Sequence, residues 1–494
     1  MTQSYYWHDY ETWGGTPAKD RPCQFAGIRT DTELNPIGEP MVLFSRPADD
    51  LLPQPDACLI TGITPQRALR DGMPEAEFAL AIQSELAAPA TCGVGYNSLR
   101  FDDEVTRYLF YRNLLDPYAH SCRNGNSRWD LIDVLRLAHA LRPDGIQWPE
   151  REPGVTSFKL EHLSAANDIP HADAHDALAD VRATIAMARL LKRAQPRLFD
   201  YTLSLRDTEN VRKLLDQGKP VLHVSQRYPA IRGAIAPVTV VGTHPNNPNQ
   251  RLCFDLRQDP AILLDLNVEQ IRERLFTPSA DLPADVERIP IKGVKVNASP
   301  ILAPIGTLGK DAAERWDIDQ QQIKVHARRI DEAKSQIADK LLKVYQGQQW
   351  QEVTDPDLML YTGGFFFRQR PAPYARSPSA QSRATEHWAS ALRRPTPANP
   401  VISHARTQLA GDTDRGRARG LGRLAPGTPD RPRSRWLYEH RRVRTTHCRI
   451  AHTTDAEYRS LGHSRPASAL GGANHGCRLL TGNLLAIGCR VIFG

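Results

Sequence analysis

The sequence predicts an α/β domain followed by a smaller β-rich domain, and two patterns support this prediction. Strand-like and helix-like segments alternate over residues 1–195, which is typical of α/β proteins. Residues 196–349 instead show short strand-like runs separated by Pro, Asn and Gly turns, a spacing that favours a small β-barrel. At 494 residues, the chain is long enough for about three domains.

The elements of the first domain follow from its apolar and turn patterns. A strand is expected at Tyr5–Glu11, where three aromatic residues precede two acids, and Leu59–Pro65 is interpreted as a turn. Further strands are expected at Phe25–Arg29, Met41–Phe44 and Cys92–Tyr96, and helices at Ala76–Leu86, Phe101–Asn113, Trp129–Leu141, Leu160–Asn167 and from His175 onward.

In the second domain, Gln320–Gln346 is predicted to be one long, charged helix. His223, Lys292 and Lys295 could line a nucleic-acid face, but each by itself is interpreted as an ordinary surface residue. The strands of the predicted barrel are expected at Val221–Ser225, Val238–Gly242, Arg251–Leu256 and Ile289–Asn297.

Charge is distributed unevenly along the chain. The formal net charge is +7, but residues 1–365 carry −8 and residues 366–494 carry +15, with 22 Arg and no Lys in the second segment. A basic chain would normally indicate nucleic-acid binding. Here the excess lies in the tail, so any nucleic-acid groove in the body must be a local basic patch.

Cysteine usage and the absence of long apolar runs indicate the compartment. The eight cysteines include no C-x-x-C pair, which argues against a zinc site and a disulfide framework. The N-terminus lacks the apolar segment of a signal peptide, and no run approaches the roughly 18 apolar residues of a membrane span. We therefore expect a cytoplasmic protein of bacterial type without membrane association.

Asp9 and Glu11 form the first candidate site. Residues i and i+2 of a strand point to the same face, so the two carboxylates should lie side by side. Such proximity raises one pKa unless a cation sits between the groups, and oxygen ligands suit Mg²⁺ or Mn²⁺. The pair alone fits a solvated edge strand equally well, and only the other acids change that judgement.

Three further residues stand at element boundaries. Asp102 follows a strand and a loop, where α/β folds place catalytic acids, although acids in a first helical turn also complement the helix dipole. His175 lies at the entry of a long helix, and Asp180 follows about one and a half turns later. Each one alone could be a cap or surface residue.

The set Asp9, Glu11, Asp102, His175 and Asp180 resembles the signature of the DEDD exonuclease superfamily, in its histidine-containing branch. Order, spacing and element types agree. Over about residues 1–365 the chain is also similar to the bacterial exodeoxyribonuclease I family, through the segments His8–Thr12, Gly95–Arg107, Asn126–Asp130 and Gln195–Tyr201.

The resemblance implies a domain order and an activity. Residues 1–195 would form a ribonuclease H-like 3′→5′ exonuclease domain, residues 196–349 an SH3-like barrel, and residues 350–365 the start of a C-terminal helical domain. The implied reaction is Mg²⁺-dependent hydrolysis of single-stranded DNA to 5′-mononucleotides, in DNA repair and recombination.

Two-metal hydrolysis gives each residue of the set an expected role. Asp9, Glu11 and Asp180 would be direct ligands of two Mg²⁺ ions, with Mn²⁺ as a substitute, and Glu11 could also touch the terminal 3′-hydroxyl. Asp102 would hold the second ion, through water. His175 would orient or deprotonate the attacking water, the alternative being a hydrogen bond to a carboxylate.

The resemblance also implies residues that contact the DNA strand. Tyr118 could instead be a core residue and Arg136 a surface charge, and Cys122 stands where the family has an aromatic residue. The implied strand contacts are Arg107, Tyr118, Arg136, Arg142 and Lys159.

Two other functions remain open at this point. An RNA 3′-exonuclease of the same superfamily would use the same catalytic residues, because the metals act on the phosphate that both substrates share. A non-catalytic adaptor would dock the acidic C-terminal tail of the single-stranded-DNA-binding protein, which the family binds. All five catalytic positions are filled, which argues against loss of catalysis. A monomer is expected.

The resemblance stops soon after Gly363-Gly364-Phe365. The family continues into a Ser, an Asp-Arg pair and a helical domain, whereas residues 366–494 are rich in Arg, Pro, Ser, Gly and His without a helical period, a composition typical of disorder. A real basic tail is one interpretation. We favour a shifted reading frame near Phe367, because codons read one nucleotide later can restore Ser-Gly-Ser-Asp-Arg. The helical domain is therefore predicted to be missing or disordered.

Overall fold

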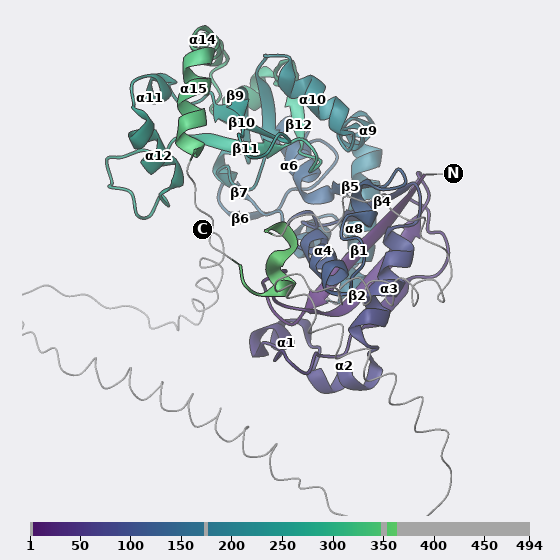
Figure 1. Ribbon diagram of the computed structural model, residues 1–494. Helices are drawn as coiled ribbons and strands as arrows, with labels where there is room; N and C mark the ends of the chain where they lie inside the picture. The colour runs from purple at the N-terminus through teal and green to yellow at the C-terminus, as the bar shows by residue number, and fades with distance from the viewer. Residues whose placement is uncertain (1–2, 172–175, 347–352, 363–494) are drawn as a thin grey trace, which may run out of the picture. The chain divides into compact units, whose positions relative to one another are not determined.

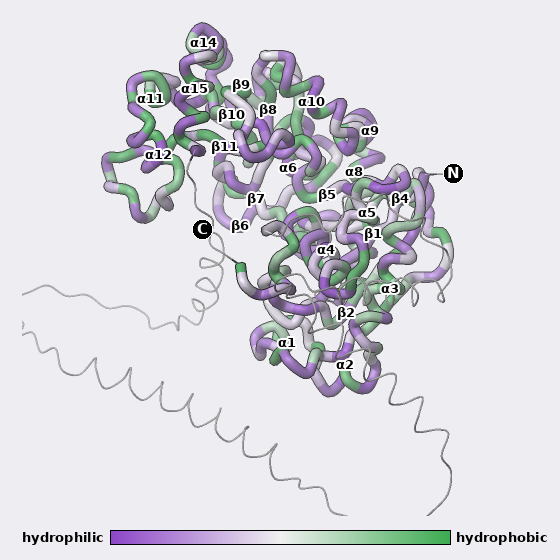
Figure 2. Tube along the Cα trace, viewed as in Figure 1, coloured by the Kyte–Doolittle hydropathy of each residue, from purple (hydrophilic) through white to green (hydrophobic). Residues whose placement is uncertain are grey.

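The computed structural model describes residues 3–171, 176–346 and 353–362. The predicted helix entry at His175 and the chain beyond residue 362 lie outside these ranges. Hydrophobic and hydrophilic residues are interspersed along the described helices and strands (Figure 2). Within the same ranges, none of the helices combines the length and the apolar character needed to cross a bilayer.

The first domain is built on a five-stranded mixed sheet with the order β3-β2-β1-β4-β5. Strands β1, β2, β4 and β5 are labelled in Figure 1. The central strand β1 (Ser4–Thr12) is antiparallel to β2 (Pro22–Thr30) and parallel to β4 (Thr91–Gly95). The edges are β3 (Met41–Phe44), antiparallel to β2, and β5 (Ser127–Asp130), parallel to β4. This arrangement confirms the predicted ribonuclease H-like α/β domain.

The two faces of β1 pack against different helices. Trp7 belongs to the apolar cluster that includes residues of α8 (Ala177–Ala194). Tyr6, one position earlier, belongs to the cluster built from α3 (Glu75–Leu86) and α4 (Asp102–Arg112). Because side chains of a strand alternate, the odd-numbered positions of β1 share the α8 face of the sheet.

Two predictions for this domain are wrong in detail. Leu59 was expected in a turn but lies in α1 (Pro55–Thr61), which has Pro at its start and ends at a glycine with φ of 67°. The helix predicted from Trp129 begins only at α6 (Leu131–Leu141), because Trp129 pairs with Val94 of β4 in a buried strand. The remaining elements are α2 (Pro65–Asp71), α5 (Ala119–Cys122), β6 (Glu150–Glu152), β7 (Val155–Thr156) and α7 (Leu160–Ala166).

The second domain contains an antiparallel five-stranded sheet with the order β11-β10-β9-β8-β12. The four predicted strands are all present. Its strands are β8 (Val221–Val224), β9 (Ile235–Thr243), β10 (Gln250–Asp255), β11 (Ile291–Lys295) and β12 (Leu302–Pro304). The helices are α9 (Pro196–Ser204), α10 (Thr208–Asp216), η1 (Ala230–Arg232), α11 (Ala261–Leu264), α12 (Val268–Phe276), η2 (Ile305–Thr307), α13 (Lys310–Arg315), α14 (Gln320–Glu332) and α15 (Lys334–Tyr345).

Two expectations for the second domain need correction. The single helix predicted at Gln320–Gln346 is interrupted at Ala333, which leaves α15 free to pack on β9. No Gly or Pro marks the break, so the local pattern could not indicate it. His223 is buried rather than on the surface, since it lies inside β8, and its Nδ1 is 3.0 Å from the hydroxyl of Tyr228.

The last described segment, η3 (Pro356–Tyr361), returns to the first domain and packs on α4. The hydroxyl of Tyr361 donates to Oε2 of Glu104 at 2.7 Å and accepts from Nη1 of Arg107 at 3.0 Å. Its ring also meets Tyr108 edge to face, with the ring centroids 6.0 Å apart. The segment is therefore fastened to α4 by polar and aromatic contacts.

Candidate metal-dependent active site

Three of the predicted acids meet between the sheet and α8. Asp9 and Glu11 occupy odd positions of β1 and so share the face that α8 covers. Asp180 comes from the first turn of α8. One carboxylate oxygen from each residue lies within 4.8 Å of the others. Three carboxylates at this separation form the kind of oxygen-rich site that a hard divalent cation prefers.

Asp176 fixes the start of α8 and thereby the position of Asp180 in its first turn. The Asp176 side chain caps the helix by accepting from the backbone N–H groups of Leu178 and Ala179. Nε2 of Gln24, on β2, donates to the other oxygen of Asp176 at 3.3 Å. The helix entry is thereby tied to the sheet strand that pairs with β1.

Burial and neighbouring acids raise the pKa values of two residues of the cluster. Burial, followed by the charges of Asp102, Glu11 and Asp180, holds the pKa of Asp9 well above its usual range. Burial and the charges of Asp180 and Asp102 raise the pKa of Glu11 to about 8. Repulsion of this kind disappears when a divalent cation binds between the groups, so the residues fit a metal site.

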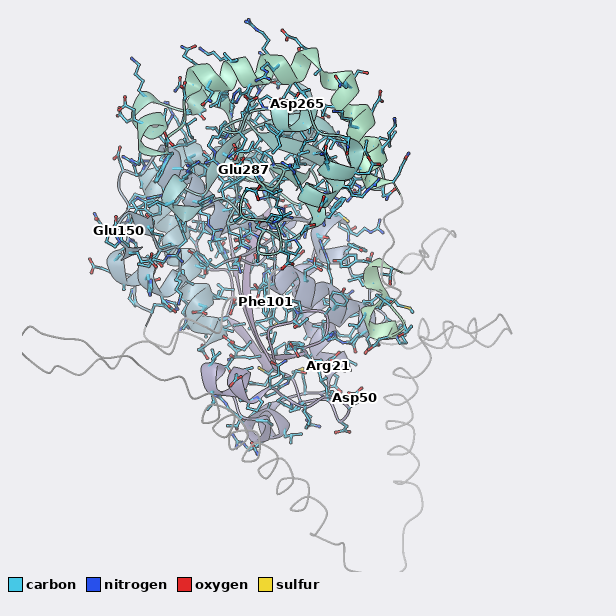
Figure 3. All side chains as sticks on the ribbon, turned by 90° about the vertical axis from the view of Figure 1, so that its left-hand side faces the viewer. Arg21, Asp50, Phe101, Glu150, Asp265 and Glu287 are labelled. Carbon is cyan, nitrogen blue, oxygen red and sulfur yellow. The ribbon has the colours of Figure 1, made fainter. Side chains whose placement is uncertain are left out.

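Asp102 stands at the N-terminus of α4, one residue after Phe101, which is labelled in Figure 3. Its buried carboxylate accepts the backbone N–H of Tyr10, a β1 residue between the two acids of that strand, at 3.1 Å. Burial raises the pKa of Asp102 to about 8. Asp102 is not among the three acids that meet within 4.8 Å. Its charge is nevertheless the strongest that acts on Asp9.

His175 lies outside the described residues, but another histidine touches the cluster. Nε2 of His171 contacts Oδ1 of Asp180, and the His171 side chain is only 5% exposed. His171 is not among the residues predicted from the sequence. The available signal was a second histidine four positions before His175, in the approach to the same helix.

The implied strand contacts near α4 are engaged within the protein. Arg107 is 13% exposed and pairs with Asp103 at 3.0 Å and with Glu104 at 2.6 Å. Its guanidinium carbon lies 5.5 Å from the ring centroid of Tyr118. These two residues therefore lie together.

The other three lie on α6 and in the segment that follows it. Arg136 pairs with Asp133 at 2.5 Å and stacks near Phe158. Arg142 directs both terminal nitrogens to the carbonyl of Thr307, at 3.4 Å each. Lys159 is 69% exposed, with its Nζ 3.1 Å from Oε1 of Glu161. Lys159 and Arg142 are thus exposed, whereas Arg136 is buried.

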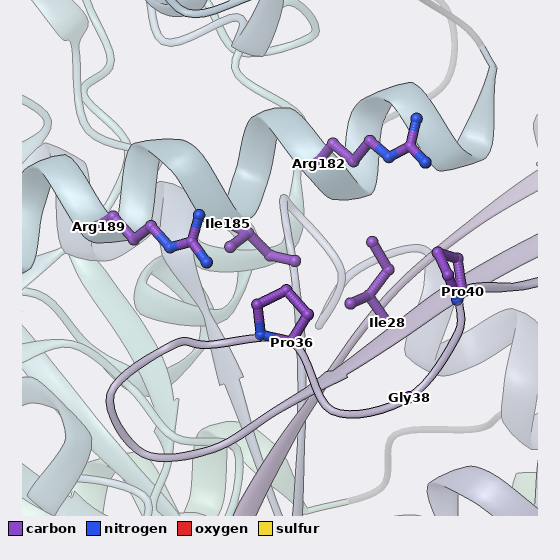
Figure 4. A pocket seen from close by; sticks show the side chains of 7 residues that line it. All are labelled: Ile28, Pro36, Gly38, Pro40, Arg182, Ile185 and Arg189. Atoms are coloured by element: carbon purple, nitrogen blue, oxygen red, sulfur yellow. The ribbon is translucent and has the colours of Figure 1, made fainter.

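A separate cavity of about 280 Å³ lies between α8 and the β2 region (Figure 4). Arg182 and Arg189 of α8 flank it, and Ile28 and Ile185 contribute apolar side chains. It contains none of the carboxylates described above, so it is not the candidate active site.

Comparison with known proteins agrees with both domains. The family model for an exonuclease domain matches residues 6–188, and the model described as the exonuclease I SH3-like domain matches residues 206–347. Exodeoxyribonuclease I of Escherichia coli is 48% identical over 372 residues, which cover 75% of this chain and 78% of that protein.

Solved structures give the same result. The zinc-bound E. coli exonuclease I in complex with single-stranded DNA is 41% identical, with a TM-score of 0.74, and the match covers 93% of this chain and 94% of that chain. A structure of SSB/exonuclease I with the inhibitor CFAM is 42% identical, with a TM-score of 0.72, covering 84% and 87% respectively. This chain belongs to the exodeoxyribonuclease I family.

Proposed function

We propose that this protein is a Mg²⁺-dependent 3′→5′ exonuclease that degrades single-stranded DNA to 5′-mononucleotides in DNA repair and recombination. The convergence of Asp9, Glu11 and Asp180, with pKa values raised for the first two, is the observation that carries this proposal. A site with unbalanced negative charge beside a mixed sheet is suited to binding divalent ions rather than to a purely structural role.

Each residue of the site has a defined task in the proposed reaction. Two bound Mg²⁺ ions, or Mn²⁺, would supply an activated water and neutralise charge on the phosphate. Asp9, Glu11 and Asp180 would hold these ions directly, and Glu11 would also contact the terminal 3′-hydroxyl. Asp102 would hold the second ion through water. His175 would accept the proton of the attacking water, because a free pKa of about 6.5 suits a base near neutral pH.

The choice of DNA over RNA rests on the relatives. The E. coli enzyme has been solved with single-stranded DNA, and the match spans the SH3-like domain as well as the nuclease domain. We propose that Arg107, Tyr118, Arg136, Arg142 and Lys159 contact the strand. Since one relative has been solved as SSB/exonuclease I, we also propose that this protein binds the C-terminal tail of the single-stranded-DNA-binding protein. A cytoplasmic location and a monomeric state complete the proposal.

A digestion assay tests the function directly. Matched DNA and RNA oligomers of one sequence, labelled at either end, are incubated with the purified protein and Mg²⁺ or EDTA. We expect loss of the 3′ label from DNA first, release of mononucleotides, and no reaction in EDTA. Intact DNA, with the fold verified by circular dichroism, would refute the proposal, and faster digestion of RNA would assign the alternative substrate.

We further propose that the segment beyond about residue 366 results from a shifted reading frame and does not form a helical domain. Its Arg content without Lys and the end of the resemblance after Phe365 support this. Resequencing the locus tests it. An uninterrupted frame through Phe367, with no alternative frame encoding an Asp-Arg pair followed by helical periodicity, would establish a real basic tail instead.

A further inference from the structure

The loop between β4 and α4 determines where Asp102 lies. It begins after Gly95, where an added Cβ would come within 2.6 Å of the Cβ of Ser98 and 3.0 Å of a backbone oxygen, so the loop lies tightly against the strand end. Asn97 then takes a left-handed conformation, with φ of 62°. Such a backbone costs free energy unless its surroundings hold it in place.

Asp130, on the neighbouring strand, fixes this backbone through hydrogen bonds. It is the last residue of β5, directly beside Gly95 in the parallel register, and its carboxylate is buried. Oδ1 accepts the backbone N–H of Asn97 at 2.8 Å, and Oδ2 accepts that of Leu99 at 3.2 Å. Oδ1 also caps α6 by accepting the N–H of Ile132 at 3.1 Å. One carboxylate therefore joins the loop to the helix.

Asp133 of α6 supports the same loop through the side chain of Arg100. Oδ2 of Asp133 accepts from Nη2 of Arg100 at 2.7 Å, and Nη1 of Arg100 reaches Oδ1 of Asn97 at 3.3 Å. Beyond the loop, the N–H of Asp103 donates to the carbonyl of Ser98 at 2.9 Å. The loop is thus fixed at both ends, and its position determines where the first turn of α4 lies.

We propose that Asp130 is a positioning residue for catalysis, which places the carboxylate of Asp102 by fixing the backbone of Asn97 and Leu99. The inference rests on the proposed role of Asp102 in metal binding. Asp130 itself bonds to backbone N–H groups of the loop and of α6, and it is not among the three acids that meet within 4.8 Å. Supporting groups of this kind contribute about 10- to 100-fold to metal affinity or rate.

The test compares three variants. Asp130→Ala removes all three acceptor bonds. Asp130→Asn keeps one oxygen that can serve Asn97 and Ile132 and loses only the bond to Leu99. Asp207→Ala is the matched control, because Asp207 caps α10 through the same helix position, accepting the N–H of Glu209 at 2.8 Å, but holds no active-site loop.

Two readouts are measured on each folded variant: Mn²⁺ affinity of the metal-free protein by calorimetry, and kcat and Kd for single-stranded DNA. Asp130→Ala should lower Mn²⁺ affinity and kcat by roughly 10- to 100-fold, with Kd for DNA unchanged. Asp130→Asn should recover most of the loss, and Asp207→Ala should match the wild type. Equal values for Asp130→Ala and Asp207→Ala would overturn the proposal, as would Asp130→Asn being as impaired as Asp130→Ala.

Two possible outcomes of this test each require a further measurement or comparison. If Asp130→Ala does not fold, Asp133→Ala frees Arg100 from α6 and should show a smaller loss in the same two quantities, whereas wild-type values would overturn the proposal. If the wild-type chain binds Mn²⁺ but degrades no single-stranded DNA, the proposed function fails, and the Mn²⁺ affinities still decide whether Asp130 places Asp102.

Discussion

Asp102 and Asp103 are consecutive buried acids at the start of α4, but they belong to oppositely charged surroundings. The carboxylate of Asp103 contacts Nη1 of Arg128, accepts from Nη2 of Arg107 at 3.0 Å, and lies 2.8 Å from Nε2 of His120. Although burial opposes ionisation, Arg128, His120 and Arg107 together hold the pKa of Asp103 far below its usual range. This side of the helix is electrostatically balanced.

The other side of the helix has no such balance. Asp102 accepts only one N–H from another residue of the described chain, that of Tyr10, and burial raises its pKa to about 8. Elsewhere in the domain, the buried Glu75 is paired with Arg21 at 3.1 Å and Arg112 at 3.2 Å. Arg21 also reaches Asp50 at 3.4 Å, and both are labelled in Figure 3.

The balance of charge around buried acids separates structural acids from acids suited to bind a cation. Buried acids that serve the fold are supplied with arginines, because an unpaired buried charge is costly. At Asp9, by contrast, burial and the charges of Asp102, Glu11 and Asp180 raise the pKa of the carboxyl group, and a divalent ion bound there would offset this repulsion. Substitutions on either side test whether the balanced and unbalanced acids have different tasks.

The largest effect is expected from removing a direct metal ligand. Asp9→Ala or Asp180→Ala should lower the rate of hydrolysis by about 10³-fold or more, because a bound metal supplies several kcal/mol of transition-state stabilisation. Single-strand binding, measured by fluorescence anisotropy, should change little. The control is Glu85→Ala, an acid paired with Arg29 on the surface of α3. Retention of more than a few per cent of activity would show that the assigned ligand is wrong.

The proposed base should have the next largest effect. His175→Ala is expected to lower turnover by about 10²- to 10⁴-fold at neutral pH, the range typical of a lost general base, with metal affinity little changed. His162→Ala is a suitable control, since His162 is half-exposed and its partners among the described residues, Ser157 and Glu161, lie in its own segment. A normal rate for His175→Ala would reduce that residue to a structural role.

Substitution on the balanced side should affect stability instead of chemistry. Asp103→Asn leaves Arg128 and Arg107 buried without their shared carboxylate and should lower the free energy of unfolding by about 3 kcal/mol. Denaturant unfolding measures this change. The folded fraction should retain its rate and its Mg²⁺ dependence. A loss of rate as large as that of Asp9→Ala would erase the distinction between the two sides.

On the unbalanced side, the stability of the metal-free protein should fall as the pH rises. The pKa of Glu11 is raised from 4.5 to about 8 on folding, so the folded protein holds this proton more tightly, and stability is lost as the pH rises through that window. Metal-free Glu11→Gln should therefore have nearly the same Tm as the wild type near pH 4.5 and a higher Tm at pH 8. Saturating Mg²⁺ should reverse the order at pH 8. A pH-independent difference would contradict this account.

The smallest effects are expected at the strand contacts. Lys159→Ala should lower the slope of log affinity against log salt by about 0.7, the share of one phosphate contact on a single strand, without changing stability. Arg107→Ala should also lower the slope, but it removes a partner of Asp103 and so should destabilise the fold. An unchanged slope for Lys159→Ala would exclude it from the groove.

Local sequence patterns predicted part of the site, and tertiary contacts determined the rest. Strand alternation alone placed Asp9 and Glu11 on one face, as the structure shows. The pattern could not separate Trp129 and Asp130 from the helix after them, because pairing with β4 rather than local preference makes that segment a strand. The opposite charge states of Asp102 and Asp103 were equally hidden, since their partners come from distant parts of the chain.

The contact between Tyr361 and α4 joins residues 254 positions apart in the chain. During synthesis at about 5–20 residues per second, α4 would therefore wait roughly 13–50 s for its partner to emerge. The SH3-like domain is synthesised within that interval. The contact with Tyr361 can therefore form only after both domains have left the ribosome. The proposed frame shift lies just beyond Tyr361, which means that a chain carrying it could still complete this last step.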